Sequence, residues 1–146
     1  MFVLIRMGNL ITILVVGSVL IAVIERIKMN EDLRLKYPEL LEHCWDLSTG
    51  PGWHSLVDNL LAAIKEEINK TPGLEVSVVQ VKSKFRGLRF YYDGGNEAIH
   101  HMADLAEEKS YSICEECGEE AADPDQFCRL NRGWYSTLCD KCKEGT

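Results

Sequence analysis

The sequence predicts an α+β fold, in which a small antiparallel β-hairpin is packed by two amphipathic helices and followed by a cysteine-rich ribbon. Three observations predict it. Apolar residues recur with helical spacing over residues 53–70 and again after Asn96. Two strand-prone runs lie between these segments, and two C-x2-C pairs follow them. The order helix, strand, strand, helix favours a sheet covered by both helices.

Composition limits the classes of function. At 146 residues, the chain has room for one modest domain with short appendages. A net charge of -7 argues against a general affinity of the surface for nucleic acid. Basic residues nevertheless gather at one place, without an acid among them: Lys82, Lys84, Arg86 and Arg89. This basic cluster is the most specific electrostatic feature of the sequence.

Residues 1–28 contain an apolar segment. Residues 7–24 form an 18-residue stretch without charge, which is at the lower limit for a transmembrane helix. More basic residues follow the stretch than precede it, which would keep the remaining chain in the cytoplasm, anchored to the inner membrane. A cleaved signal peptide is disfavoured because Leu20 and Ala22 make a poor cleavage site. In a second interpretation, translation starts at Met29 and the segment is not part of the mature protein.

Residues 29–52 are predicted to be a helical lead-in and a linker. Pro38 is suited to open the second half of the lead-in, because proline is tolerated in a first helical turn. Residues 48–52 read Ser-Thr-Gly-Pro-Gly, which predicts a break and an internal boundary. The expected apolar contacts of the lead-in are Leu33, Leu40, Leu41, Cys44 and Trp45.

Residues 53–111 are predicted to form an α-β-β-α core. The first helix, over residues 53–70, should be the main packing element and ends at Thr-Pro-Gly. Strands are expected over residues 74–85 and 88–92, with Arg86 and Gly87 turning or bulging the hairpin. Asn96 can cap the second helix, which continues to about Lys109. That helix is expected to bury Ala98, Ile99, Met102, Leu105 and Ala106.

Residues 112–146 carry four cysteines with the spacing of a zinc ribbon. Cys114 and Cys117 form one C-x2-C pair, and Cys139 and Cys142 form a second pair after 21 intervening residues. Each short loop can aim two sulfurs at one ion, and a tetrahedral Zn²⁺ takes two such loops. Four thiolates leave no open coordination position, so the predicted zinc is structural. Cys128 is interpreted as an ordinary thiol, and two disulfides are the alternative in an oxidising compartment.

Several separated motifs agree in order with one known group of proteins. They are Gly-Trp at residues 52–53, the segment QVKSKFRGLRFYY at 80–92, CEECG at 114–118, and Gly-Trp at 133–134 before Cys139. Over residues 37–142 the chain resembles small, mostly uncharacterised proteins of bacteriophages and prophages. The resemblance implies a phage accessory protein without an established activity. Members often end the second cysteine pair with His and usually begin near the position of Met29.

A binding module is the first functional hypothesis, with a host or phage protein as the expected partner. The alternative ligand is an anionic nucleotide-like molecule or a nucleic acid, since cations beside exposed aromatic rings suit phosphates and bases. A solvated strand face, whose cations pair with acids of the helix that follows, is the competing interpretation of the same residues. The expected contact residues are Lys82, Lys84, Arg86, Arg89, Tyr91 and Trp134.

An enzyme, such as a small hydrolase, is the second functional hypothesis. His54, His100 and His101 are the candidates for acid-base chemistry. No nucleophile motif or phosphate-binding loop accompanies them, and adjacent histidines on a helix point about 100° apart. The sequence therefore predicts no catalytic residues.

Overall fold

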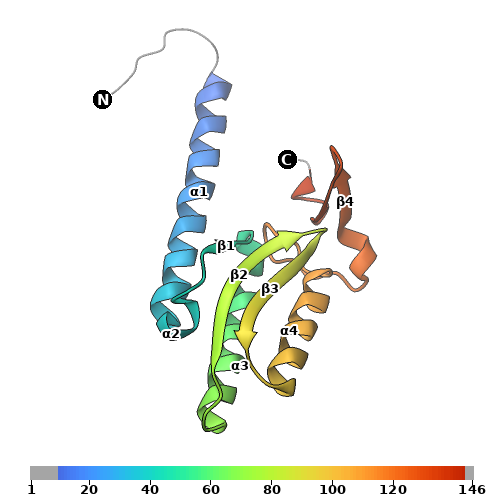
Figure 1. Ribbon diagram of the computed structural model, residues 1–146. Coiled ribbons are helices and arrows are strands. Elements are labelled where there is room, and N and C mark those ends of the chain that lie inside the picture. Colours follow the sequence, from blue (N-terminus) through green and yellow to red (C-terminus); the bar gives the residue numbers. More distant parts are fainter. Residues whose placement is uncertain (1–9, 144–146) are drawn as a thin grey trace, which may run out of the picture.

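The computed structural model describes residues 10–143 and has an α+β fold (Figure 1). Over these residues it contains four α-helices, a three-stranded sheet and a two-stranded sheet. In chain order the elements are α1 (Leu10–Lys36), α2 (Pro38–Leu41), β1 (Asp46–Ser48), the 3₁₀ turn η1 (Pro51–Trp53), α3 (His54–Lys70), β2 (Val76–Lys84), β3 (Gly87–Gly94), α4 (Glu97–Ser110), the 3₁₀ turn η2 (Pro124–Phe127), β4 (Cys128–Asn131) and β5 (Trp134–Thr137). This confirms the predicted fold class and the order of the core elements.

The three-stranded sheet has the order β1-β2-β3. Strands β2 and β3 form the predicted antiparallel hairpin, and its turn is made by Phe85 and Arg86, whose φ angles are 51° and 61°. Strand β1 pairs in parallel with β2 and places Leu47 beside Val81. Strand β1 thus adds a parallel pair to the predicted antiparallel hairpin. Helix α3 connects β1 to β2, which makes a compact βαβ unit.

In Figure 1, α3 lies behind β2 and β3 and α4 lies beside β3, and both helices pack against the sheet. Asn96 caps α4, since its side chain accepts a hydrogen bond from the backbone N–H of Ile99 at 3.0 Å. The outer edge of β3 is covered by α4. The Leu88 and Phe90 backbone N–H groups donate to side chains of Ser110 and Glu107 at 2.8 and 2.9 Å. This edge therefore has few free donors for another strand.

The core is formed by apolar side chains of α1, α2, the sheet, α3 and α4. Trp53 lies at its centre and is fully buried, as are Val57, Leu61 and Ile64 of α3. Two residues expected to be buried are exposed. Trp45, which precedes β1, is 69% exposed, and Leu105 is 49% exposed where it lines an open hollow between α3 and α4. The remaining predicted contacts of the lead-in, Leu33, Leu40, Leu41 and Cys44, are buried.

Helix α1 runs without a break from the apolar segment into the charged lead-in. It ends at Lys36, and Pro38 opens α2, as predicted from the proline. The candidate anchor spans residues 7–24, and residues 7–9 lie outside the described part of the chain. Among the residues that the structure describes, no helix combines the length and the apolar character needed to cross a membrane.

Candidate metal centre

The first pair of cysteines lies in a tight turn directly after α4. The Gly118 backbone N–H donates to the Cys114 carbonyl at 2.9 Å, and the Cys114 N–H donates to the Glu119 carbonyl at 2.8 Å. Gly118 has a φ of 79°, a left-handed conformation that favours glycine. Gly118 thereby lets the chain turn so that both sulfurs face the same side.

The second pair follows β5 in an equivalent turn. The N–H groups of Cys142 and Lys143 both donate to the carbonyl of Cys139, at 3.2 and 3.1 Å. Strands β4 and β5 form the hairpin that returns the chain to the first turn, and Arg132 and Gly133 make its two-residue loop with φ angles of 48° and 84°. The two cysteine pairs, distant in sequence, are thereby brought together.

The four sulfurs form one compact cluster. The Sγ atoms of Cys114, Cys117, Cys139 and Cys142 all lie within 4.8 Å of one another, and those of Cys117 and Cys139 are 3.6 Å apart. Four sulfurs at about 2.3 Å from a tetrahedral ion would be separated by about 3.8 Å. The cluster therefore fits a tetrahedral metal ion with four thiolate ligands.

The same geometry contrasts with a disulfide framework. All six cysteines are free, and a disulfide would bring two sulfurs to about 2.05 Å. Cys128 is not part of the four-sulfur cluster, in agreement with its interpretation as an ordinary thiol. A set of four thiolates fills a tetrahedral shell, so the cluster offers no position for water or substrate.

Burial and mutual contact shift the pKa values of the clustered cysteines. Burial raises the pKa of Cys142 far above its ordinary value, and the neighbouring thiols of Cys117 and Cys139 raise it further. Burial also raises the pKa of Cys139. At Cys114 burial acts in the same direction, but backbone N–H groups of Cys139, Cys117 and Glu116 outweigh it and lower the pKa. A cation at the centre would stabilise all four thiolates together.

The first cysteine turn is packed against the loop at residues 50–53, which was predicted to be a break between parts of the chain. The Gly52 N–H donates to the Glu115 carbonyl at 2.7 Å, and the Trp53 indole N–H donates to the Ile113 carbonyl at 2.8 Å. A Cβ atom on Gly52 would collide with the Cys114 carbonyl oxygen. The loop is thus a tight junction between the core and the cysteine turn.

Glu115 is a half-buried acid at this junction. Its carboxylate accepts hydrogen bonds from the Ser83 hydroxyl at 3.0 Å and from the Gly50 N–H at 3.2 Å. Burial raises the pKa of Glu115 above its ordinary value despite these two donors. The side chain therefore joins β2 and the loop before η1 to the first cysteine turn.

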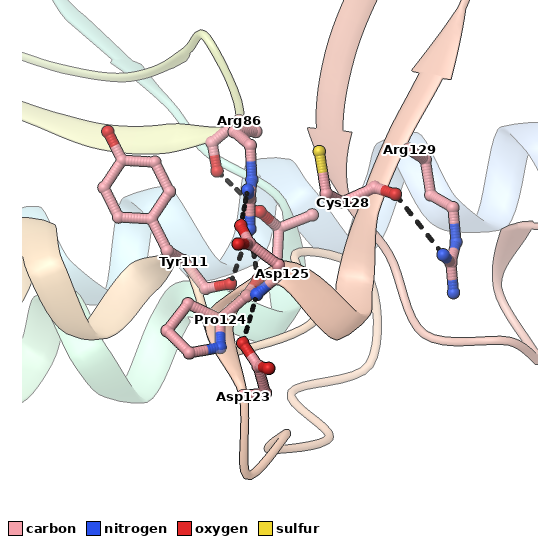
Figure 2. A network of polar contacts seen from close by, with 8 residues as sticks. Arg86, Tyr111, Asp123, Pro124, Asp125, Cys128 and Arg129 are labelled. Carbon is pink, nitrogen blue, oxygen red and sulfur yellow. Dashed lines mark hydrogen bonds and ion pairs between the residues drawn. The ribbon is translucent and has the colours of Figure 1, made fainter.

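Arg86 forms a second junction, shown in Figure 2. Its guanidinium group makes a 3.0 Å ion pair with Asp125, donates to the carbonyls of Tyr111 and Pro124, and lies over the Tyr111 ring. Its backbone N–H donates to the Tyr135 carbonyl at 3.1 Å. The turn of the β2–β3 hairpin is thereby fixed to η2 and β5, and only 14% of the Arg86 side chain is exposed.

The other predicted contact residues separate into two groups. Arg89 is engaged inside the molecule, with Glu107 at 3.3 Å and the Tyr111 hydroxyl at 3.1 Å. Lys82 and Lys84 instead lie over the exposed rings of Tyr91 and Phe85, at 5.5 and 5.2 Å from the ring centroids. Trp134 lies on the β4–β5 hairpin and lines a hollow of about 330 Å³ with residues of the first cysteine turn.

The three histidines do not converge on one site. His54 begins α3, where its Nε2 atom is 3.8 Å from a carboxylate oxygen of Asp32 in α1. His100 lies in the first half of α4, at the other end of the helix pair in Figure 1, and its Nδ1 atom is 2.5 Å from the Tyr92 hydroxyl. His101 is exposed. The structure therefore brings together the cysteines but not these candidates for acid-base chemistry.

Sequence reasoning missed the residues that attach the cysteine cluster to the core. Trp53 was assigned to a helix face, while its indole N–H contacts the residue before Cys114. Glu115 lies in a run of acids with Glu116, Glu119 and Glu120, and this pattern gives no sign of its contact with Ser83. The two segments in contact, Gly52-Trp53 and residues 114–118, are about sixty residues apart in the sequence. The spacing of residues in a single sequence predicts local elements but not a contact over this separation.

Comparison of the chain with protein-family models, with curated proteins and with solved structures finds no match. The resemblance to phage proteins therefore remains a prediction.

Proposed function

We propose that the chain is a zinc-stabilised, non-catalytic binding module whose partner is a protein. Zn²⁺ is the ion that four thiolates in a tetrahedral arrangement select most commonly among structural sites. The metal would hold the two cysteine turns together and would not catalyse a reaction. Reduced thiols at the cluster fit a reducing compartment such as the cytoplasm.

The observation that carries a binding role is a group of exposed aromatic side chains on two joined hairpins. Phe85 and Tyr91 of the β2–β3 hairpin are 66% and 43% exposed, and Trp134 and Tyr135 of the β4–β5 hairpin are 78% and 51% exposed. Tryptophan and tyrosine are enriched at the energetic centres of protein interfaces. Because Arg86 fixes one hairpin to the other, these side chains are presented on a rigid support, which lowers the entropic cost of binding.

A protein partner is favoured over a nucleic acid because few cations remain available. Arg86 and Arg89 are engaged by Asp125 and Glu107, so the basic cluster offers Lys82 and Lys84. Nucleic-acid binders commonly neutralise six or more phosphates, and roughly two phosphate contacts would give only weak affinity. The phage resemblance adds that a host or phage protein is the class of partner to search first.

The test is affinity capture with the zinc-loaded full chain, followed by quantitative mass spectrometry. The Trp134→Ala/Tyr135→Ala variant should lose the captured protein, since the truncation of interface aromatics commonly costs about 2 kcal/mol or more. Trp45→Ala is the matched control, because it removes another exposed tryptophan from a different part of the surface. Equal capture by all three proteins, or capture of none by the wild type, would contradict the proposed function.

A further inference from the structure

The open face of the three-stranded sheet carries two lysines that make no ion pair with an acid of residues 10–143. Lys82 and Lys84 are two residues apart on β2, so their side chains project from the same face. The opposite face holds Val81 and Phe90, which are buried in the core under the helices. Lys82 and Lys84 therefore point away from the helices.

No acid within residues 10–143 lies within ion-pair distance of either lysine. The neighbouring strand β1 offers Asp46, but its carboxylate accepts a hydrogen bond from the Gln80 amide at 2.8 Å. Acidic residues outnumber basic ones in a chain of net charge -7, so most basic side chains could form an ion pair within the molecule. Two adjacent cations left over on one strand are thus available to an anion from outside.

Each lysine is paired with an exposed ring. The Lys82 ammonium lies 5.5 Å from the Tyr91 centroid, and the Lys84 ammonium lies 5.2 Å from the Phe85 centroid. Such cation–π contacts hold the charged group beside the ring while leaving its other side free for a carboxylate. We call this group the basic-aromatic face; it consists of Lys82, Lys84, Phe85 and Tyr91. It places two positive charges beside two exposed aromatic rings.

This face adjoins the exposed aromatics of the ribbon. The residue that follows Phe85 donates its backbone N–H to the Tyr135 carbonyl, so the hairpin turn and β5 are in direct contact. A partner that covers Tyr135 could extend onto β2 without crossing a gap.

We propose that the basic-aromatic face binds an acidic segment of the protein partner, whose carboxylates meet Lys82 and Lys84 and whose apolar side chains cover Phe85 and Tyr91. The inference rests on the proposed function and names the chemistry of the partner. Charge complementarity selects an acidic segment, and two cations suit a short peptide better than a polyanion such as nucleic acid.

The experiment is selection of peptides from a random twelve-residue display library on the zinc-loaded full chain. The expected result is enrichment of peptides that carry Asp or Glu beside aromatic or aliphatic residues. The affinity of an enriched peptide, measured by fluorescence anisotropy, should fall about tenfold or more in Lys82→Glu/Lys84→Glu and should weaken with salt.

Two variants keep the result interpretable. Lys28→Glu/Lys65→Glu changes the net charge equally at exposed lysines of α1 and α3 and should bind the peptide as the wild type does. Lys82→Gln/Lys84→Gln removes the charges without reversing them and serves if the first variant fails to fold. Zinc content and far-ultraviolet circular dichroism report the folding of each.

Enrichment of neutral or basic peptides, or of no peptides, would overturn the inference. It would also be overturned if Lys82→Glu/Lys84→Glu bound an acidic peptide as tightly as Lys28→Glu/Lys65→Glu does. Binding of a labelled twelve-nucleotide oligothymidylate that needs Lys82 and Lys84, without enrichment of acidic peptides, would overturn it in favour of nucleic acid. These outcomes are distinct from failure of the proposed function, which depends on capture of a protein through Trp134 and Tyr135.

Discussion

The core and the ribbon, here residues 112–143, bury very different amounts of apolar surface. The core cluster contains nineteen buried hydrophobic residues, including Trp53 and Phe90, and extends over all four helices and the three-stranded sheet. The ribbon cluster contains four, of which two are the cysteines Cys114 and Cys139. The burial of so few apolar groups supplies too little free energy to order some thirty residues. The core can be stabilised by packing, whereas the ribbon needs cross-links, which the four sulfurs can supply through one ion.

Hydrogen bonds join the well-packed core to the sparsely packed ribbon. The Trp53 indole N–H, the Gly52 backbone and the Arg86 guanidinium all reach from the well-packed core to backbone or side-chain groups of the segment that begins at Tyr111. We therefore expect the core to orient the first cysteine turn before a metal binds, and the second turn, which reaches the core through β5, to depend more on the metal. This difference predicts that metal loss affects the ribbon far more than the core.

The largest effect is expected from removing a ligand. Cys139→Ser should abolish stoichiometric zinc binding and unfold the ribbon, because a three-thiolate site loses much of the free energy that couples binding to folding. Most of the helical circular dichroism signal should remain, since α3 and α4 belong to the core. Cys128→Ser is the matched control and should keep both zinc and melting temperature. An unchanged melting curve for Cys139→Ser would show that the cysteines do not hold a structural metal.

A smaller effect is expected at the junction. Gly52→Ala places a Cβ atom against the Cys114 carbonyl and 2.5 Å from the Gly118 nitrogen, so the loop and the first cysteine turn must separate. Overpacking of this kind commonly costs about 1–3 kcal/mol. Urea denaturation should show this loss together with weaker zinc affinity.

Gly17→Ala is the control for this substitution, since no atom lies within 4 Å of the added Cβ. Alanine in a helix is favoured over glycine, so stability should stay equal or rise slightly. Equal stability of Gly52→Ala and wild type would mean that the ribbon is not docked on the core at this loop.

The smallest effect is expected at the contact between α1 and α3. Asp58 accepts hydrogen bonds from Lys36 at 2.7 Å and from the Tyr37 hydroxyl at 2.6 Å. Burial acts to raise the pKa of Asp58, but the hydrogen bonds from Lys36 and Tyr37 outweigh it and lower the pKa below its ordinary value. The unfolded chain therefore binds this proton more readily, so the stabilisation is present above the ordinary pKa of aspartate and is lost as pH falls through the folded-state pKa.

Asp58→Asn should consequently reduce the free energy of unfolding by less than about 1 kcal/mol at pH 7, because the pair is partly exposed. The difference between the two proteins should shrink as pH falls through the folded-state pKa of Asp58, which lies below the ordinary pKa of aspartate. Chemical denaturation of both proteins at each pH is the measurement, since acid loss of the metal affects both equally. A difference that persists at low pH would assign the effect to packing instead of charge.

The predictable parts of this protein are those encoded by neighbouring residues. The C-x2-C pairs, the Asn96 cap and the Asn131-Arg132-Gly133 turn are local patterns with a local physical cause, and the structure has each of them. Strand β1 was missed because three residues are too short to show alternation. The exposure of Trp45 and the Arg86–Asp125 ion pair depend on contacts between distant segments, which no local pattern encodes.

The most direct test of the central claim is hydrogen exchange of the full chain, measured by mass spectrometry with bound zinc and after chelation. We expect native mass spectrometry to find one zinc ion per chain. We also expect chelation to abolish protection over residues 112–143 while α3 and β2 stay protected. Unchanged protection of the ribbon after chelation, or a mass lower by about two protons per cysteine pair without zinc, would contradict a ribbon folded by a metal at Cys114, Cys117, Cys139 and Cys142.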